Sequence, residues 1–214
     1  MKFCPLCNWR IARERAKMLN LWSLTIQQPK HVVLTQRNFE TLTREKIRGF
    51  QKAFAKLRRT ALWKPVKGGC ISIEITNENR GWHLHGHILA DVRWLDAGQL
   101  AITWGNLVGQ EFGIVKVKDA RGKGYLGEIT KYVVKGAQLA SWEPEKIAQF
   151  IGAIKGIRFF APFGSLFGMG AQIKKKLAAM KPEKPKCKCG CEDFKFESET
   201  SSILGEIRRE AKRR

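Results

Sequence analysis

The sequence predicts an α+β fold built on an antiparallel β-sheet. Four segments carry apolar residues in the pattern or composition of strands, at 31–35, 69–77, 82–89 and 112–118. Four others repeat apolar residues at helical spacing, near 43–59, 96–108, 125–141 and 142–158. The first seven elements follow the order β-α-β-β-α-β-α. This order indicates a ferredoxin- or RRM-like sheet of the split-βαβ kind, in which the second and third strands form a hairpin.

The helix after the first strand has clear sequence signals. Thr43 is of a residue type that caps helix N-termini. The apolar stripe of the helix consists of Ile47, Phe50, Phe54 and Leu57. Its other side chains are mainly basic, as expected for a helix with one buried side and one side toward a polyanion. Residues 8–22 are also basic with helical spacing and indicate a helix that faces DNA.

The C-terminal part of the chain has a different composition. Residues 159–170 are rich in Phe and Gly and predict an irregular packed loop. Residues 174–188 contain a basic linker with prolines, and 208–214 form a basic end. We expect these tails to be solvated and to contact phosphates rather than to extend the sheet.

The charge of the chain indicates its partner. It contains 40 Lys and Arg residues against 19 Asp and Glu, a formal net charge of +21. Such an excess favours nucleic acid, because neutralised phosphates release condensed counterions. No apolar run approaches the roughly 18 residues of a membrane-spanning helix, and the N-terminus lacks the apolar stretch of a signal peptide. We expect a soluble, cytoplasmic protein without a membrane partner.

The cysteines are typical of a reducing compartment and a metal site. Five of them form two clusters, Cys4 with Cys7 and, far downstream, Cys187, Cys189 and Cys191. Neither cluster has the four ligands of a structural Zn²⁺ ion, so the two together could complete one site. The alternative is that the clusters are unconnected or bind no metal. Cys70 lies in an apolar strand and is expected in the core.

The predicted strand at 82–89 carries the strongest chemical signal. His83, His85 and His87 alternate along it, so a strand places all three imidazoles on one face. The core-facing positions are then Trp82, Leu84, Gly86 and Ile88. Neutral imidazole is a common ligand of divalent metals, which makes this face a candidate metal site. The alternative is an edge strand whose histidines merely tolerate solvent.

A carboxylate on the preceding strand can join the histidines. If the three isoleucines at 71, 73 and 75 enter the core, Glu74 lies on the same exposed face as the histidines across the hairpin. Two imidazoles and a carboxylate suit Mg²⁺ or Mn²⁺ with positions left for phosphate oxygens. Glu78 is the alternative ligand, although we expect it in the turn. Glu74 could also be an ordinary surface glutamate.

A second cluster of reactive side chains lies at residues 128–135. On a helix, Glu128, Tyr132 and Lys135 share one face. A tyrosine on a cationic surface can attack phosphate, and a carboxylate one turn away can act as a general base. The same spacing also fits an ordinary amphipathic surface. Tyr125 is the only other tyrosine, so few nucleophiles compete.

Three motifs, taken in order, resemble those of HUH endonucleases: Leu34-Thr35, the histidine strand, and residues 128–135. The resemblance is greatest to the rolling-circle replication initiator (Rep) proteins of small plasmids, the Rep_1-like group. These proteins also carry a CPxC knuckle followed by a basic segment, similar to residues 4–10 here. The resemblance covers roughly residues 4–160. It implies an HUH endonuclease core with a small zinc-binding element and basic tails.

The resemblance also implies a metal centre. His85 and His87 match the paired ligands of a catalytic Mg²⁺ or Mn²⁺, and Glu74 would be the third ligand. Gly86 stands between the histidines, where relatives carry a bulky apolar residue. His83 with His85 is therefore the alternative pair.

The catalytic roles are implied in the same way. Tyr132 matches the nucleophile, and Glu128 matches a glutamate four residues before it. Lys131 and Lys135 match the lysines of this motif. The implied reaction is site- and strand-specific nicking and joining of DNA through a 5′-phosphotyrosine intermediate that leaves a 3′-OH primer.

The resemblance divides the chain into three regions. Residues 1–25 would be a zinc-knuckle and basic segment, 26–160 the nickase domain, and 161–214 a basic extension with the second cysteine cluster. The expected DNA-binding residues are Arg10, Arg13, Arg44, Arg48, Lys52, Arg58 and Arg59. The expected partners are single-stranded or extruded origin DNA, a host helicase and a host DNA polymerase. The alternatives are a relaxase, a single-tyrosine transposase, or a non-catalytic zinc-ribbon protein that binds nucleic acid.

Overall fold

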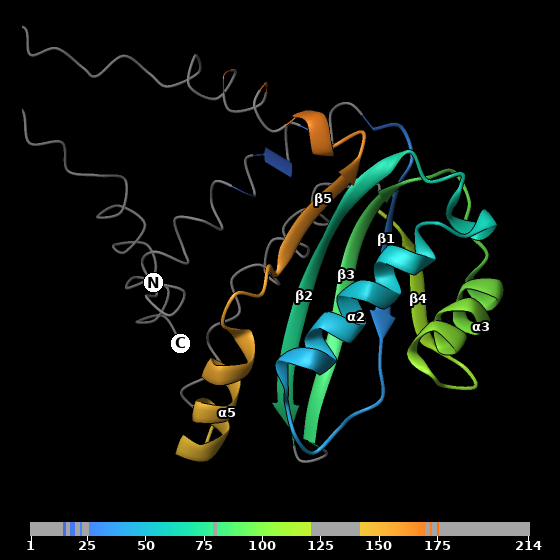
Figure 1. The fold of residues 1–214 in the computed structure, drawn as a ribbon. Helices are drawn as coiled ribbons and strands as arrows, with labels where there is room; N and C mark the ends of the chain where they lie inside the picture. Colours follow the sequence, from blue (N-terminus) through green and yellow to red (C-terminus); the bar gives the residue numbers. More distant parts are fainter. Residues whose placement is uncertain are drawn as a thin grey trace, which may run out of the picture. The chain divides into compact units, whose positions relative to one another are not determined.

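The computed structural model describes residues 26–78, 81–120 and 142–169, and six single residues: Arg15, Met18, Leu19, Trp22, Gln172 and Lys175. All of them belong to the first of two units of the chain, residues 1–176. In this described part of the chain the fold is α+β, with a five-stranded open sheet and three helices (Figure 1). Within the described residues, no helix has the length and apolar character needed to span a membrane.

The five strands are β1 (Pro29–Thr35), β2 (Gly68–Glu78), β3 (Gly81–Asp91), β4 (Ile114–Asp119) and β5 (Phe160–Gly164). Their order in the sheet is β4-β1-β3-β2-β5, and every neighbouring pair is antiparallel. The histidine strand β3 is therefore central, and β1 and β2 run parallel on either side of it. This confirms the predicted antiparallel sheet and the hairpin of its second and third strands.

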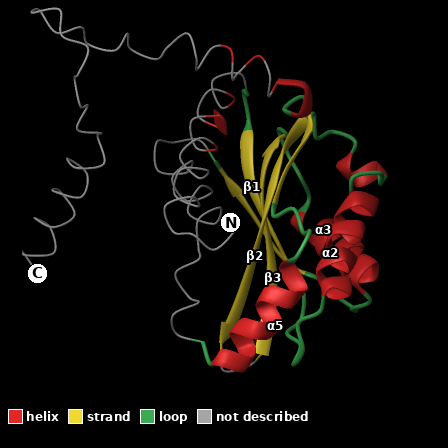
Figure 2. Cartoon of the chain, turned by 60° about the vertical axis from the view of Figure 1, so that its left-hand side comes forward, coloured by secondary structure: helices red, strands yellow, loops and turns green. Residues whose placement is uncertain are grey.

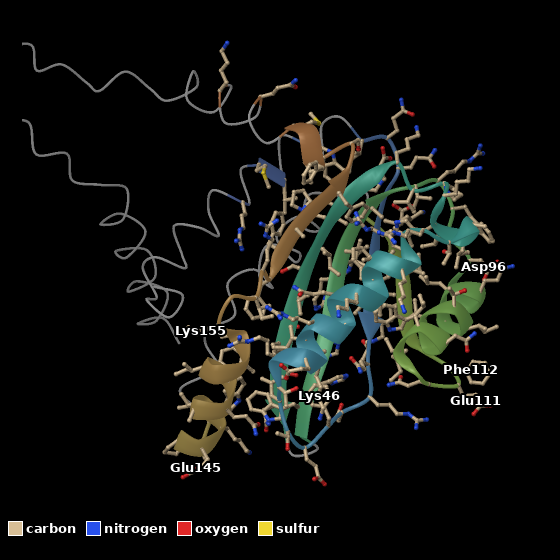
Figure 3. The ribbon with its side chains drawn as sticks, in the orientation of Figure 1. Lys46, Asp96, Glu111, Phe112, Glu145 and Lys155 are labelled. Carbon is tan, nitrogen blue, oxygen red and sulfur yellow. The ribbon has the colours of Figure 1, made fainter. Side chains whose placement is uncertain are left out.

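The helices are α2 (Arg44–Leu57), α3 (Ala97–Val108) and α5 (Pro144–Ile154), with short 3₁₀ turns at Ala61–Trp63 and Phe167–Met169. Figure 2 shows α2 and α3 together on one side of the sheet. The cap predicted for α2 is present, because Thr43 Oγ1 accepts a hydrogen bond from the Lys46 amide at 3.3 Å. In the same way Asp96 caps α3 through the Gln99 amide at 2.9 Å (Figure 3).

The core lies between these helices and the sheet. From the sheet it includes Val32, Leu34, Ile71, Ile73, Ile75, Trp82, Leu84 and Ile88, all buried. The predicted stripe of α2 packs against them, as do Leu100 and Trp104 of α3. Phe50 and Trp104 meet edge to face, with ring centroids 5.0 Å apart. The predicted division of β3 into a core face and a histidine face is therefore confirmed.

Two sequence predictions differ from the structure. Residues 159–170 are not simply an irregular loop, because they contain β5 and a 3₁₀ turn. Pro162 does not prevent strand formation, since β5 is an edge strand with one unpaired side. Glu78 does not lie in the turn but ends β2, paired with Gly81. The predicted helix at 125–141 lies outside the described residues.

Gly86 is explained by the packing of α2 against the sheet. A Cβ atom at this position would lie 3.0 Å from Phe50 Cε1 and 3.1 Å from Ile71 Cδ1. Phe50 therefore occupies the space in which a larger side chain on β3 would lie.

We predict that Gly86→Leu lowers the free energy of unfolding by about 1–3 kcal/mol, because the added side chain overpacks the core. Chemical denaturation measures the loss, and the double variant with Phe50→Ala should recover part of it. Gly49→Ala is the control, because a Cβ there has no atom within 4 Å. Equal stability of Gly86→Leu and wild type would contradict this account of Gly86.

Candidate functional site

All four histidines of the chain lie on one face of the sheet, opposite α2 and α3. His83, His85 and His87 alternate along β3 with buried core residues. His31 of β1 belongs to the same face, because it pairs with Leu89, two positions beyond His87. On the other side, Glu74 of β2 pairs directly with His85. The predicted grouping of Glu74 with the histidines is confirmed.

His87 is the centre of this group. Its Nε2 atom lies 3.0 Å from Glu74 Oε2, and its Nδ1 atom lies 3.3 Å from His31 Nε2. The rings of His31 and His87 are stacked, with centroids 5.5 Å apart and an interplanar angle of 19°. Since the two nitrogens lie on opposite sides of an imidazole, His87 is held between a carboxylate and a second imidazole. This fixes the orientation of its ring.

His85 has a different environment. Its Nδ1 atom lies 3.0 Å from Thr35 Oγ1 of β1. Its ring centroid is 4.0 Å from that of His83 and 6.0 Å from that of His87. Thr35 therefore holds His85 from one neighbouring strand, while the register places Glu74 beside it on the other.

The prediction that Glu74 and the histidines share an exposed face is wrong for the centre of that face, which is buried. Glu74 is 7% exposed, His87 5% and His31 5%. Alternation of side chains identifies the two faces of a strand, but it does not show whether the polar face is covered. Part of the N-terminal segment lies on this side: the Arg15 guanidinium is 5.0 Å from the ring of Phe160, which pairs with Ser72.

Burial makes His31 a neutral imidazole. Desolvation, together with smaller effects of His87 and Lys118, lowers its pKa from 6.5 to about 4. A neutral imidazole can either donate or accept at Nε2, depending on its tautomer. His31 Nε2 can therefore accept a hydrogen bond from His87 Nδ1 when that atom carries a proton, and can donate one when it does not.

We predict that His31 makes the protein less stable in acid. The unfolded chain takes up a proton near pH 6.5, whereas folded His31 does so only near pH 4. Stability from this residue is therefore complete above about pH 6.5 and falls as the pH drops toward 4, by roughly 2–3 kcal/mol. Denaturation at a series of pH values, with EDTA present, should show a flatter profile for His31→Gln. Identical profiles would contradict the assignment.

The histidine face offers nitrogen and oxygen donors for a divalent cation. Across residues 26–78, 81–120 and 142–169, no three His, Cys, Asp or Glu side chains converge as a group that would hold a metal ion. However, His87 Nε2 and Glu74 Oε2 are 3.0 Å apart, about the spacing of adjacent ligand atoms in an octahedron with bonds of ~2.1 Å. His85, opposite Glu74, would join them by rotation about its side-chain bonds. Glu74, His85 and His87 are therefore the residues that could hold a Mg²⁺ or Mn²⁺ ion, and two of them already place donor atoms at this spacing.

Several predicted site residues lie outside the described residues. These are the catalytic set Tyr132, Glu128, Lys131 and Lys135, the cysteines Cys4, Cys7, Cys187, Cys189 and Cys191, and the basic residues Arg10 and Arg13. Cys70 is described, and it is fully buried as predicted. Burial raises the pKa of its thiol to about 12.

The predicted DNA-binding residues of α2 do not share a face with the histidines. Arg44, Arg48 and Lys52 belong to α2, and Arg58 and Arg59 follow it directly. Because α2 packs on the core face of the sheet, these cations and the histidines lie on opposite sides of it.

Sequence reasoning missed two members of the group, His31 and Thr35. Both belong to a strand that was predicted, but neither was assigned to the metal face. The period of two that groups the histidines of β3 also places these two residues on one face of β1. Locating them also required knowing that β1 lies beside β3 in the sheet.

Comparisons with known proteins do not identify a family for the chain. No protein-family model matches the sequence, and no curated protein and no solved structure matches it either. The functional interpretation therefore depends on the residues and the geometry of the histidine face.

Proposed function

We propose that the protein is a metal-dependent tyrosine endonuclease that nicks and rejoins origin DNA and so initiates rolling-circle replication. The observation that carries this proposal is the buried pair of His87 and Glu74, with His85 opposite Glu74 on the central strand. A carboxylate and two imidazoles on adjacent strands are suited to a hard divalent cation that contacts phosphate.

The arrangement of the sheet supports the proposal. The elements β1-α2-β2-β3-α3-β4 and the strand order β4-β1-β3-β2 match a split-βαβ sheet. In the HUH proteins that the sequence resembles, a sheet of this kind carries the metal-binding histidines. The central position of β3 is consistent with that core.

The proposed mechanism assigns a role to each group. Glu74, His85 and His87 would hold a Mg²⁺ or Mn²⁺ ion, which would supply positive charge to the scissile phosphate. The Tyr132 oxygen attacks phosphorus and the bond from phosphorus to the 3′ oxygen breaks. The tyrosine hydroxyl loses its proton to water and the departing 3′ oxygen takes one up from water, so the step leaves a 5′-phosphotyrosine and a 3′-OH with no net change in protons. The 3′-OH then primes a host polymerase, with a host helicase to unwind the duplex. Glu128 activates water or assists release at termination, and Lys131 and Lys135 bind phosphate oxygens.

The cysteine clusters would have a structural role. We propose that the cysteines bind structural Zn²⁺, Cys4 and Cys7 in one cluster and Cys187, Cys189 and Cys191 in the other. Thiolates are the usual ligands of structural zinc. Zinc content after exhaustive dialysis, in wild type and in Cys4→Ser, tests this assignment.

A covalent adduct is the direct test of the nickase. A labelled pool of single-stranded oligonucleotides is incubated with the protein and Mn²⁺ or Mg²⁺, and adducts are resolved on a denaturing gel. We expect an adduct that requires metal, persists in Tyr125→Phe and is lost in Tyr132→Phe. An adduct that survives Tyr132→Phe would contradict the assignment of the nucleophile.

A non-catalytic nucleic-acid-binding protein is the second candidate. One observation favours it: His87 and Glu74 also form an ordinary buried hydrogen-bonded pair, which needs no metal. This candidate predicts that oligonucleotides bind but give no adduct with either metal.

A further inference from the structure

A groove on the helix side of the sheet lies between α2 and the edge strand β5. It encloses about 200 Å³. One wall comes from α2, with Gln51, Phe54, Ala55 and Arg58. The opposite wall comes from Arg158 and residues 161–163, and Ile71 and Ile73 of β2 form the floor. Because these isoleucines alternate with Ser72 and Glu74, the groove and the histidine face lie on opposite sides of the sheet.

The groove has an apolar interior and a cationic rim. Phe54 and Phe163 meet edge to face at its base, with ring centroids 5.6 Å apart. The Arg58 guanidinium lies 5.6 Å from the centroid of the Phe54 ring and 5.3 Å from that of Phe163. Arg58 and Arg158 are both exposed. A flat ring that enters the groove would therefore meet aromatic and aliphatic carbon and a planar cation.

A row of cations follows the exposed side of α2 next to the groove. Arg48, Lys52, Lys56 and Arg59 are all exposed. In the described part of the chain, none of them forms an ion pair. From Arg48 to Lys56 the row is about 12 Å long, enough to contact more than one phosphate of a bound strand. The charge of Arg48 acts on the Glu45 carboxylate one turn earlier, whereas Lys52, Lys56 and Arg59 add positive charge that no carboxylate among the described residues pairs with. This excess of positive charge favours a polyanion at this surface.

We propose that this groove binds one base of a single-stranded nucleic acid whose phosphates follow the cations of α2. The occupant must combine a flat, mainly apolar ring with several negative charges outside the pocket, and a nucleotide within a strand has both. The volume is below the roughly 300–1,000 Å³ of pockets for drug-sized ligands, so it suits one ring system. The strand is single, because a base in a duplex is paired and stacked.

This site does not depend on the nickase reaction. It would hold a segment of DNA on the side of the sheet away from the histidines. If the proposed nickase is also correct, the strand must pass around the sheet between the two sites. The bound segment would then lie several nucleotides from the scissile phosphate.

The test measures binding of the full chain to short oligonucleotides in EDTA, so that no metal-dependent cleavage occurs. Oligothymidine is compared with an oligonucleotide of the same length and charge that has abasic residues. We expect wild type to prefer the oligonucleotide with bases by about 5- to 150-fold, the range for one stacked base. Ala55→Leu, which fills the groove without a change of charge, should remove most of this preference.

Three further variants separate the groove from general effects. Ala148→Leu makes the same change at an exposed position of α5 and should behave as wild type. Arg158→Gln should reduce the preference without filling the groove, which keeps the test valid if Ala55→Leu folds poorly. Lys52→Gln should instead lower the slope of log affinity against log salt by about 0.7 and leave the preference for bases intact.

Two results would overturn the proposal. One is wild-type protein that binds the abasic and base-containing oligonucleotides equally. The other is that a polyglutamate peptide competes as well as oligothymidine and no longer binds to the Ala55→Leu variant. That result would show that the groove binds an acidic protein. Because no step uses Tyr132 or a metal, failure of this test leaves the nickase proposal unaffected, and the reverse also holds.

Discussion

Replacing Glu74 by glutamine is expected to slow metal-dependent adduct formation by on the order of 100-fold or more. A neutral amide is a weak ligand for a hard divalent cation, whereas its shape matches that of the carboxylate. The amide oxygen can still accept a hydrogen bond from His87 Nε2, 3.0 Å from the present carboxylate oxygen. The fold should therefore persist while affinity for Mn²⁺ falls. Adduct rates and Mn²⁺ titrations measure the two effects.

Ser72→Ala is the matched control for this prediction. Ser72 is on the same strand and the same face, and it pairs with His87. It is 1% exposed, and in the part of the chain that the structure describes its hydroxyl has no hydrogen-bond partner. Its removal should leave both the adduct rate and the affinity for Mn²⁺ near wild type. Wild-type rates in Glu74→Gln would show that the carboxylate does not bind the catalytic metal.

Most of the fold follows from local patterns in the sequence. The cap at Thr43, the apolar stripe of α2 and the isoleucines of β2 each specify an element and its buried side. The buried isoleucines also predicted that Glu74 lies on the face of the sheet opposite the core. The pairing of β2 with β3 required only a short hairpin, so the register of Glu74 with His85 was predictable.

What the sequence did not predict depends on contacts between distant segments. The strand β5 was missed because Pro162 and the nearby glycines are typical of loops, and pairing with β2 outweighs that preference. His31 was missed because its contact with His87 joins residues 56 positions apart. The burial of Glu74 also depends on tertiary packing. The alternation of side chains along a strand does not show whether a face is covered by other segments.

The position of the cations on α2 was the least predictable feature. Their number indicated a polyanion, but a charge pattern does not show on which side of a sheet a helix packs. The apolar stripe of α2 packs on the face opposite the histidines. The predicted DNA-binding residues and the predicted metal ligands therefore face different regions of any bound strand.

The largest effect on metal affinity is expected for substitution of His87. Comparison with substitution of His83 shows which two histidines of β3 bind the metal. His87→Asn removes the imidazole nearest Glu74 and should weaken Mn²⁺ binding by on the order of 100-fold or more. His83→Asn should change it by less than about 5-fold. His83 pairs with Thr76 rather than with an acidic residue, and its nearest imidazole is that of His85.

Mn²⁺ titrations of His83→Asn, His85→Asn and His87→Asn distinguish the two possible pairs. If His85→Asn and His87→Asn lose affinity for Mn²⁺ while His83→Asn keeps it, the result supports a metal centre formed by His85, His87 and Glu74. If instead His83→Asn and His85→Asn lose affinity for Mn²⁺ and His87→Asn keeps it, the metal belongs to His83 and His85. His87 would then be a structural partner of Glu74. Thermal unfolding of each variant is needed, because His87 is buried and its loss can weaken the fold. A loss of affinity at unchanged stability separates ligation from packing.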